Sequence, residues 1–250
     1  MKTAFVTGAS SGIGRATAVA LAKAGCQLVV TGRRRDRLDA LAAELAPVPV
    51  HVLEFDVRDR DAVTAAVIGL PLEFAAVDVL VNNAGGAHGL NPVQTGDPRD
   101  WDTMLDANVR GLLNVTHALL PGMTARKSGF IVNIGSIAGR DAYANGNVYC
   151  ASKAAVAMLT KTMRLDLLPF GIRVAEVDPG AVETEFSEVR FKGDAERAAK
   201  VYEGYTPLRA EDIADVIAFV VTRPAHVNIA DVLILPTAQG AASTIFRQPG

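Results

Sequence analysis

The chain has few cysteines, no excess of charge of one sign and no long apolar run suited to a lipid bilayer. Two cysteines in 250 residues are too few for a disulfide framework, and free thiols are typical of an intracellular protein. The formal net charge is −2, which gives no general attraction to nucleic acid or an anionic membrane. The longest uncharged run, residues 79–96, is rich in Asn and Gly, and the N-terminal apolar run is too short for a signal peptide. We therefore expect a cytoplasmic protein without a nucleic-acid or membrane partner.

Apolar residues, in contrast, are abundant. They make up 50% of the chain, which is too hydrophobic for disorder and sufficient for a large core. Some apolar surface is expected to remain for a subunit contact. No linker rich in Ser, Gly or Pro divides the sequence and no repeat is visible, so we expect one domain over residues 1–250.

Short β-branched runs alternate with longer amphipathic stretches. The expected strands cover residues 3–6, 27–31, 50–55, 77–81, 130–134, 173–177 and 232–235. The first expected helix begins near residue 13 and is ended by Gly25 as a C-terminal cap. The other expected helices cover residues 36–44, 59–70, 99–120, 148–168 and 210–221. This alternation predicts an α/β fold, a single doubly wound Rossmann-type domain with about seven parallel strands and helices on both faces. The charged segment 186–205 delays the last helix and is expected to be a substrate lid.

A glycine-rich turn, Thr-Gly-Ala-Ser-Ser-Gly-Ile-Gly at residues 7–14, joins the first expected strand to a helix. Glycines let backbone amides approach an anion, and the helix N-terminus adds partial positive charge. The position of the turn favours a dinucleotide site over a purely structural turn. The predicted cofactor ligands here are Gly8, Ser10, Ser11, Gly12, Ile13 and Gly14.

Three consecutive arginines follow the second expected strand. In NAD-binding folds an acid about 20 residues beyond the glycines holds the ribose 2′-hydroxyl. Here Arg34 stands at that distance from Gly14, and guanidinium binds a 2′-phosphate that an acid would repel. We therefore predict NADP rather than NAD, held by Arg33 and Arg34. A solvated arginine cluster is the alternative.

Three later turns also carry candidate cofactor ligands. Asp56, followed by Val57, is placed to bind the adenine amino group or to cap the helix beginning near residue 59. The turn with Asn82, Ala84 and Gly85 has either an adenosine-packing or a structural role. The last turn follows the expected strand over residues 173–177, and its candidate ligands are Pro179, Gly180, Val182 and Thr184. It is placed to bind the nicotinamide carboxamide or the pyrophosphate, and a turn without a ligand is the alternative.

Three polar residues are predicted to carry chemistry. Ser136 follows the fifth expected strand, and Tyr149 and Lys153 share one helical face at i and i+4. A free tyrosine has a pKa near 10, and a neighbouring ammonium together with the nicotinamide ring favours the phenolate. Tyr149 would exchange the proton of an alcohol as hydride moves, while Ser136 hydrogen-bonds the reacting oxygen.

Asn108 lies within the expected helix over residues 99–120, where asparagine is a modest helix breaker. Its side chain, or a loosened backbone around it, is predicted to hold a water near Lys153. A solvent-facing side chain is the alternative.

These motifs together resemble the short-chain dehydrogenase/reductase family over essentially the whole chain. The matching positions are 7–14, 82–85, 108, 136, 149, 153 and 179–180. The resemblance implies a catalytic tetrad of Asn108, Ser136, Tyr149 and Lys153, with no metal. It also implies a homotetramer whose contacts use the two long helices expected over 99–120 and 148–168.

Segments 54–58, 146–149, 184–194 and 224–229 are similar to the NADP-dependent 3-hydroxy acid dehydrogenase branch of that family. The similarity implies oxidation of serine, allo-threonine, 3-hydroxyisobutyrate or 3-hydroxypropionate, or reduction of malonic semialdehyde. A 3-hydroxy acid needs a cation for its carboxylate. Arg190 and Lys192 are candidates unless they lie on a solvated face, and Arg140 is another unless Asp141 neutralises it. The other expected pocket residues are Ser136, Asn147, Tyr149 and His88.

The sequence thus predicts an oxidoreductase that transfers hydride reversibly between NADP(H) and a 3-hydroxy acid. One alternative is a carbonyl or 3-oxoacyl reductase of the same fold with a bulkier substrate. A non-catalytic NADP sensor is an alternative of another class, which the intact Ser136, Tyr149 and Lys153 set disfavours.

Overall fold

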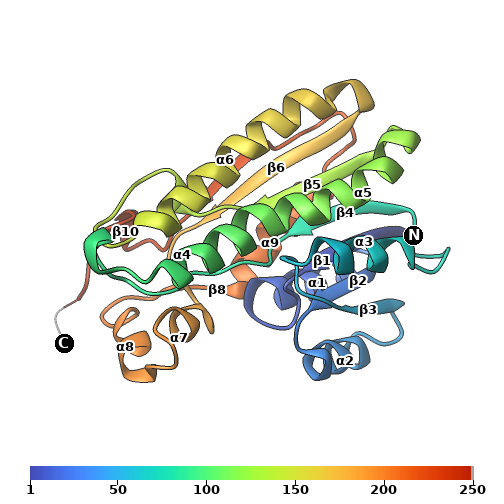
Figure 1. Ribbon diagram of the computed structural model, residues 1–250. Helices are drawn as coiled ribbons and strands as arrows, with labels where there is room; N and C mark the ends of the chain where they lie inside the picture. Colours follow the sequence, from blue (N-terminus) through green and yellow to red (C-terminus); the bar gives the residue numbers. More distant parts are fainter. Residues whose placement is uncertain (249–250) are drawn as a thin grey trace.

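A parallel seven-stranded sheet forms the centre of the protein, shown by a computed structural model that describes residues 1–248 (Figure 1). Each neighbouring pair of strands runs parallel. In spatial order the strands are β3 (Val50–Glu54), β2 (Cys26–Gly32), β1 (Lys2–Thr7), β4 (Val77–Asn82), β5 (Gly129–Ile134), β6 (Ile172–Pro179) and β9 (Asp231–Ile234). All seven predicted strands are confirmed. Strand order reverses between β1 and β4, where a crevice for ligands is expected at the carboxyl ends of the strands.

Helices cover both faces of this sheet. The main ones are α1 (Gly12–Lys23), α2 (Arg35–Glu44), α3 (Arg60–Ile68), α4 (Pro98–Leu105), α5 (Leu112–Arg126), α6 (Asn147–Leu167) and α9 (Ala210–Val221). One buried cluster joins the sheet to α1, α2 and α9, and a second joins it to α3, α5 and α6. Successive strand residues point to opposite faces, so Val6 enters the first cluster and Phe5 the second. Gly25 has a φ of 86° just after α1, as its predicted capping role requires.

The helix expected over residues 99–120 is interrupted. A π-helical segment, Asp106–Gly111, separates α4 from α5, and Asn108 lies within it. This is the loosened backbone predicted around Asn108, and π segments often mark functional sites. The predicted end at residue 120 is wrong, because α5 continues past Pro121 to Arg126 and ends at Lys127 with a φ of 51°.

The segment predicted as a lid forms two short helices, α7 (Phe186–Arg190) and α8 (Ala195–Lys200). Figure 1 shows them apart from the main helical layers, next to β8 (Leu208–Arg209). β8 pairs with β7 (Val182–Glu183), and β10 (Gln239–Ala241) pairs with β11 (Thr244–Ile245). These four strands have only two or three residues each, too few for a periodic signal in the sequence. Within residues 1–248 no helix is long and apolar enough to cross a membrane.

Candidate active site

Ser136, Tyr149 and Lys153 lie together at the carboxyl end of β5, each no more than 9% exposed. Ser136 begins a short 3₁₀ turn, where its Oγ accepts a hydrogen bond from the Ala138 amide at 3.1 Å. Tyr149, in the first turn of α6, lies close enough to Ser136 for the serine hydroxyl to act on its pKa. One turn further along, Lys153 Nζ donates to the Ile134 carbonyl at 2.9 Å. The structure therefore brings together the three residues chosen from their spacing.

Burial dominates the electrostatics of this group. It raises the pKa of Tyr149 well above the usual 10, and the hydrogen bond with Ser136 acts in the opposite direction. Burial also lowers the pKa of Lys153 to about 8, while the nearby Asp178 and Glu176 act to raise it. For the chain alone, desolvation is thus the largest effect on the pKa of Tyr149, and the predicted action of Lys153 together with the nicotinamide ring stays a prediction. The phenol form is favoured, ready to donate a proton.

Asn108 anchors the loop after β4 to α6. Its Oδ1 accepts from the Gly86 amide at 2.8 Å, and its Nδ2 donates to the Gly86 carbonyl and to Ser152 Oγ, both at 2.9 Å. Gly85 must lack a side chain here, because a Cβ would lie 2.4 Å from Asn108 Oδ1. The alternative of a solvent-facing Asn108 is wrong, since the residue is 3% exposed.

The glycine turn after β1 is tightly folded. Gly8 and Gly12 have φ values of 66° and 51°, which L side chains rarely adopt. A Cβ on Gly14 would lie 2.3 Å from the Gly8 carbonyl oxygen. The Ile13 side chain packs against α9, so only its backbone faces the turn. These positions form a cradle of backbone amides at the N-terminus of α1, as dinucleotide pyrophosphate requires.

Gly14→Ala tests this cradle. The added methyl group overlaps backbone that has no free space, which is expected to cost roughly 1–3 kcal/mol of stability and to weaken NADP binding. Urea unfolding and a cofactor titration measure the two effects. Gly240→Ala is the control, because no atom lies within 4 Å of its added Cβ. Equal stability of the two variants would contradict the close approach.

Arg34 lies across the glycine turn. It donates to Ser11 Oγ at 2.7 Å and to Ser10 Oγ at 3.1 Å, and it pairs with Glu185 at 2.9 Å. Arg33, with a side chain 71% exposed, lies 3.9 Å from Asp56. The structure therefore places Arg34 against the predicted phosphate turn and leaves Arg33 at its edge. Glu185 was not predicted, because no spacing rule links it to the arginines.

Asp56 does not cap α3. Its carboxylate binds the Arg58 guanidinium at 2.7 Å and accepts from the Arg58 amide. Asp59 caps the helix instead by accepting from the amides of residues 61 and 62. The capping alternative for Asp56 is therefore wrong. Val57 is buried against Gly111 of the π-helical segment. A Cβ added to Gly111 would lie 2.6 Å from Val57 Cγ2.

The turn after β4 is tied to its neighbours by side-chain amides. Asn82 is buried and donates to Thr116 and Asn133 at 2.9 Å each, which supports its structural reading. The Ala84 amide donates to the Thr7 hydroxyl at 2.9 Å, fixing this turn beside the glycine turn. Of the two roles predicted for this turn, adenosine packing and a structural role, the contacts of Asn82 favour the structural role.

The turn after β6 lies beside the cradle. The Gly180 amide donates to the Ile234 carbonyl at 2.8 Å, immediately after Pro179, the last residue of β6. Thr184 lies next to Gly12, because a Cβ added to Gly12 would lie 3.4 Å from the Thr184 side chain. The Thr184 hydroxyl accepts a hydrogen bond from the Phe186 amide. Val182 belongs to β7. Thr184 of this turn therefore lies directly beside the glycine turn.

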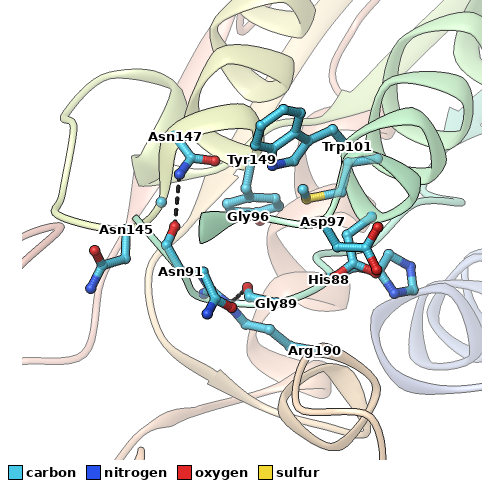
Figure 2. A pocket seen from close by; sticks show the side chains of 13 residues that line it. His88, Gly89, Asn91, Gly96, Asp97, Trp101, Asn145, Asn147, Tyr149 and Arg190 are labelled. Carbon is cyan, nitrogen blue, oxygen red and sulfur yellow. Dashed lines mark hydrogen bonds between the residues drawn. The ribbon is translucent and has the colours of Figure 1, made fainter. Parts of the chain in front are cut away.

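Tyr149 and Arg190 both line one pocket (Figure 2). Arg190 donates to the Tyr143 hydroxyl at 2.9 Å and to the Gly89 carbonyl at 3.2 Å, and its guanidinium lies 5.7 Å from the Tyr149 ring centroid. Asn147 also lines the pocket and donates to the Asn91 carbonyl. Trp101 and Tyr143 shape this region, and no motif in the sequence indicated them.

The other predicted cations are neutralised by neighbours. Lys192 lies 3.0 Å from Asp100. Arg140 binds Asp178 at 2.6 Å, so it is not Asp141 that neutralises it. His88 lines the pocket, and burial lowers its pKa, so it is neutral at pH 7. Among residues 1–248 no carboxylate lies within 4 Å of the Arg190 guanidinium, which leaves its charge available to a ligand.

Comparison with known proteins agrees with this geometry. A family model described as short chain dehydrogenase matches residues 2–195. The chain belongs to this family. It is 50% identical to sulfoacetaldehyde reductase of Chromohalobacter salexigens, over 94% of both chains. It is 45% identical to the NADP-dependent 3-hydroxy acid dehydrogenase of Schizosaccharomyces pombe, over 99% of this chain and 97% of that one.

A solved structure described as the closed form of serine dehydrogenase complexed with NADP⁺ superposes with a TM-score of 0.94. It is 42% identical and covers 98% of this chain and 100% of its own. The predicted fold, family and oxidoreductase class are therefore confirmed.

Proposed function

We propose that the protein is an NADP-dependent oxidoreductase that interconverts a 3-hydroxy acid and its 3-oxo acid. The observation behind this proposal is that Tyr149, which lies beside Ser136, and Arg190 line the same pocket. A proton donor and an anion anchor at one pocket suit a substrate with both a carbonyl group and an acid group.

NADP is the cofactor that these residues suit. The cradle at Gly8, Gly12 and Gly14 has room only for backbone amides, and Arg34 lies against it. Arg34 would hold the 2′-phosphate, and Thr184 and the turn after β6 would hold the nicotinamide half. Relatives named as NADP-dependent and a neighbour with NADP⁺ support this assignment.

Arg34→Ala tests the cofactor assignment. Loss of charge-assisted hydrogen bonds at this half-exposed position is expected to weaken NADP⁺ binding about tenfold and to change NAD⁺ binding much less, because NAD⁺ lacks the phosphate. Cofactor dissociation constants measure both effects. Arg35→Ala is the control, since Arg35 pairs with Asp39 on its own helix. A similar loss for both cofactors would contradict the assignment.

The chain's residues then divide the chemistry. Bound NADP accepts or supplies the hydride at the reacting carbon. Tyr149 donates a proton to the carbonyl oxygen during reduction and removes it during oxidation, and Ser136 hydrogen-bonds that oxygen. Lys153, beside this pair, holds positive charge near the phenol. Asn108 fixes the loop and helix that bring these groups together.

Arg190 supports the proposed substrate class. Its two donated hydrogen bonds orient the guanidinium towards Tyr149, and a guanidinium binds a carboxylate in two-point contact. The helices of 186–205 act as the lid that carries it. A sulfonate offers similar oxygens, so reduction of a sulfo-aldehyde is a second candidate, and the likeness to sulfoacetaldehyde reductase favours it.

Initial rates with NADP⁺ across a panel test the proposal. Serine, allo-threonine and 3-hydroxyisobutyrate should be oxidised, and neutral alcohols of equal size should not. Turnover only on bulky ketones or 3-oxoacyl thioesters, assayed with NADPH as the reductant, would instead support the carbonyl reductase alternative. An absence of turnover with intact cofactor binding would support the sensor alternative.

A homotetramer remains part of the proposal. The exposed apolar side chains Leu113 of α5 and Met158 and Leu165 of α6 lie on the two helices predicted to form its contacts. The cytoplasmic location also stays a prediction.

A further inference from the structure

Two carboxyl groups are buried beneath the Ser136 turn. Glu176 and Asp178 lie two residues apart on β6 and are 2% and 1% exposed. Both reach the backbone of Gly135, where a Cβ would lie 1.8 Å from Asp178 Oδ1 and 2.4 Å from Glu176 Oε1. Gly135 joins Ser136 to Ile134, whose carbonyl accepts from Lys153. The two acids therefore lie against the stretch of backbone that carries both Ser136 and the carbonyl group bound by Lys153.

The surrounding charges do not fully neutralise this pair. Arg140 pairs with Asp178 Oδ2 and also with Asp231, which is half-exposed on β9. Lys153 on α6 is the other cation that acts on Glu176. Asp178 Oδ1 is buried and has no hydrogen-bond partner among the described residues if both acids are ionised.

A proton between the two carboxyls resolves this arrangement. Two ionised carboxylates in contact repel strongly, and like charges that share a site push one pKa upward. A protonated Glu176 donates to Asp178, which leaves one negative charge on the pair. Arg140 already occupies the side of Asp178 open to a cation, so a proton suits the site better than a metal ion.

We propose that Glu176 and Asp178 share one proton and act as a positioning pair that holds the Ser136 turn and keeps Lys153 charged. Asp178 holds the Ser136 turn through Arg140, which follows the 3₁₀ turn that Ser136 begins. Both acids also hold this turn by contact with Gly135. The effect on Lys153 follows from the negative charge left on the pair. The catalytic consequence rests on the proposed function; the shared proton does not.

The titration behaviour supports the geometry. Burial, followed by the charge of Asp178, raises the pKa of Glu176 to about 8, and Lys153 and Arg140 oppose this rise. Asp178 and Glu176 in turn raise the pKa of Lys153 against the larger effect of its burial. As the pH passes 8, ionisation of Glu176 adds a second negative charge near Lys153 and helps it retain its proton.

Glu176→Gln in the cofactor-free chain tests the shared proton. Glutamine keeps a donor to Asp178 but does not ionise. Because the folded-state pKa of Glu176 lies above its ordinary 4.5, its contribution to stability is full below pH 4.5 and is lost as the pH rises to 8. The melting temperature of the wild type should therefore fall by roughly 5 °C relative to Glu176→Gln between pH 5 and 8.

Glu73→Gln is the matched control, because Glu73 is exposed and far along the chain from this site. Its melting temperature should follow that of the wild type throughout. A constant difference between the wild type and Glu176→Gln over this range would overturn the proposal. So would a rise in wild-type melting temperature with millimolar Mg²⁺ or Ca²⁺ that Glu176→Gln lacks, since a cation would then occupy the site.

Two further readouts complete the test. Carbon-13 labelling of glutamate carboxyls in the wild type should reveal one that titrates near pH 8, and its absence would overturn the proposal even if the variant failed to fold. In kcat/KM for the reduction, the alkaline decline should begin at lower pH in Glu176→Gln than in the wild type, because Lys153 loses its proton earlier. An unchanged decline would refute the link to Lys153.

Discussion

Tyr149→Phe is expected to lower kcat about 10²- to 10⁴-fold, the usual contribution of a positioned acid–base group. The substitution removes only the hydroxyl that exchanges a proton with the reacting oxygen. The ring keeps its packing against Phe186, with centroids 5.7 Å apart, so the fold and the cofactor affinity should persist. Rates in both directions and a cofactor titration measure the effect.

Tyr143→Phe provides the control for Tyr149→Phe. Tyr143 lies near the same pocket and its hydroxyl accepts from Arg190, but it is not the proposed proton donor. Its loss should reduce kcat far less. If Tyr149→Phe retained more than a tenth of the wild-type kcat, or if both variants fell equally, the assignment of the proton donor to Tyr149 would be wrong.

The same residue gives the two directions different pH dependences. Burial holds the pKa of Tyr149 above its usual range, so the phenol form required for reduction is present throughout the neutral range. Oxidation requires the phenolate and should accelerate as the pH rises.

Arg190→Met is expected to raise KM for a 3-hydroxy acid roughly 10- to 100-fold, because a charge-assisted contact contributes about 1.5–3 kcal/mol. Methionine keeps the apolar part of the side chain and removes the charge. The rate with a neutral aldehyde of similar size should change little. Steady-state kinetics with both substrates separate loss of the anion anchor from general damage to the lid.

Lys192→Met is the control for Arg190→Met. Lys192 lies two residues further along the same segment, but its ammonium is already paired with Asp100. Its KM for the acid should therefore stay within a few-fold of the wild-type value. Equal losses with the acid and the neutral aldehyde in Arg190→Met would refute the role of Arg190 as a carboxylate anchor.

Much of the fold could be predicted because its signals are local. Seven short β-branched runs gave seven strands, and the glycines at 7–14 required a tight turn before a helix. Ser136, Tyr149 and Lys153 were found from spacing, since i and i+4 share a helix face. The π-helical segment could be foreseen only as a disturbance at Asn108, because its geometry depends on contacts with Gly86 and Ser152.

The features that the sequence did not reveal depend on contacts distant along the chain. Glu185 reaches Arg34 across 151 residues, and Arg140 pairs with Asp178 rather than with its neighbour Asp141. The proton shared by Glu176 and Asp178 follows from burial and from the close approach to Gly135. None of these has a spacing rule, because each depends on how loops meet at the carboxyl edge of the sheet.

The activity proposed for this pocket is hydride transfer between NADP and an acid that carries a hydroxyl group at carbon 3. Its most direct test is NADPH formation, followed at 340 nm, by the purified protein with serine or 3-hydroxyisobutyrate, compared with NAD⁺ as cofactor and with neutral alcohols as substrate. We predict clear turnover with NADP⁺ and the acids, slower turnover with NAD⁺, and very little with the neutral alcohols. Equal rates with neutral alcohols, or no turnover with any 3-hydroxy acid, would rule out this activity.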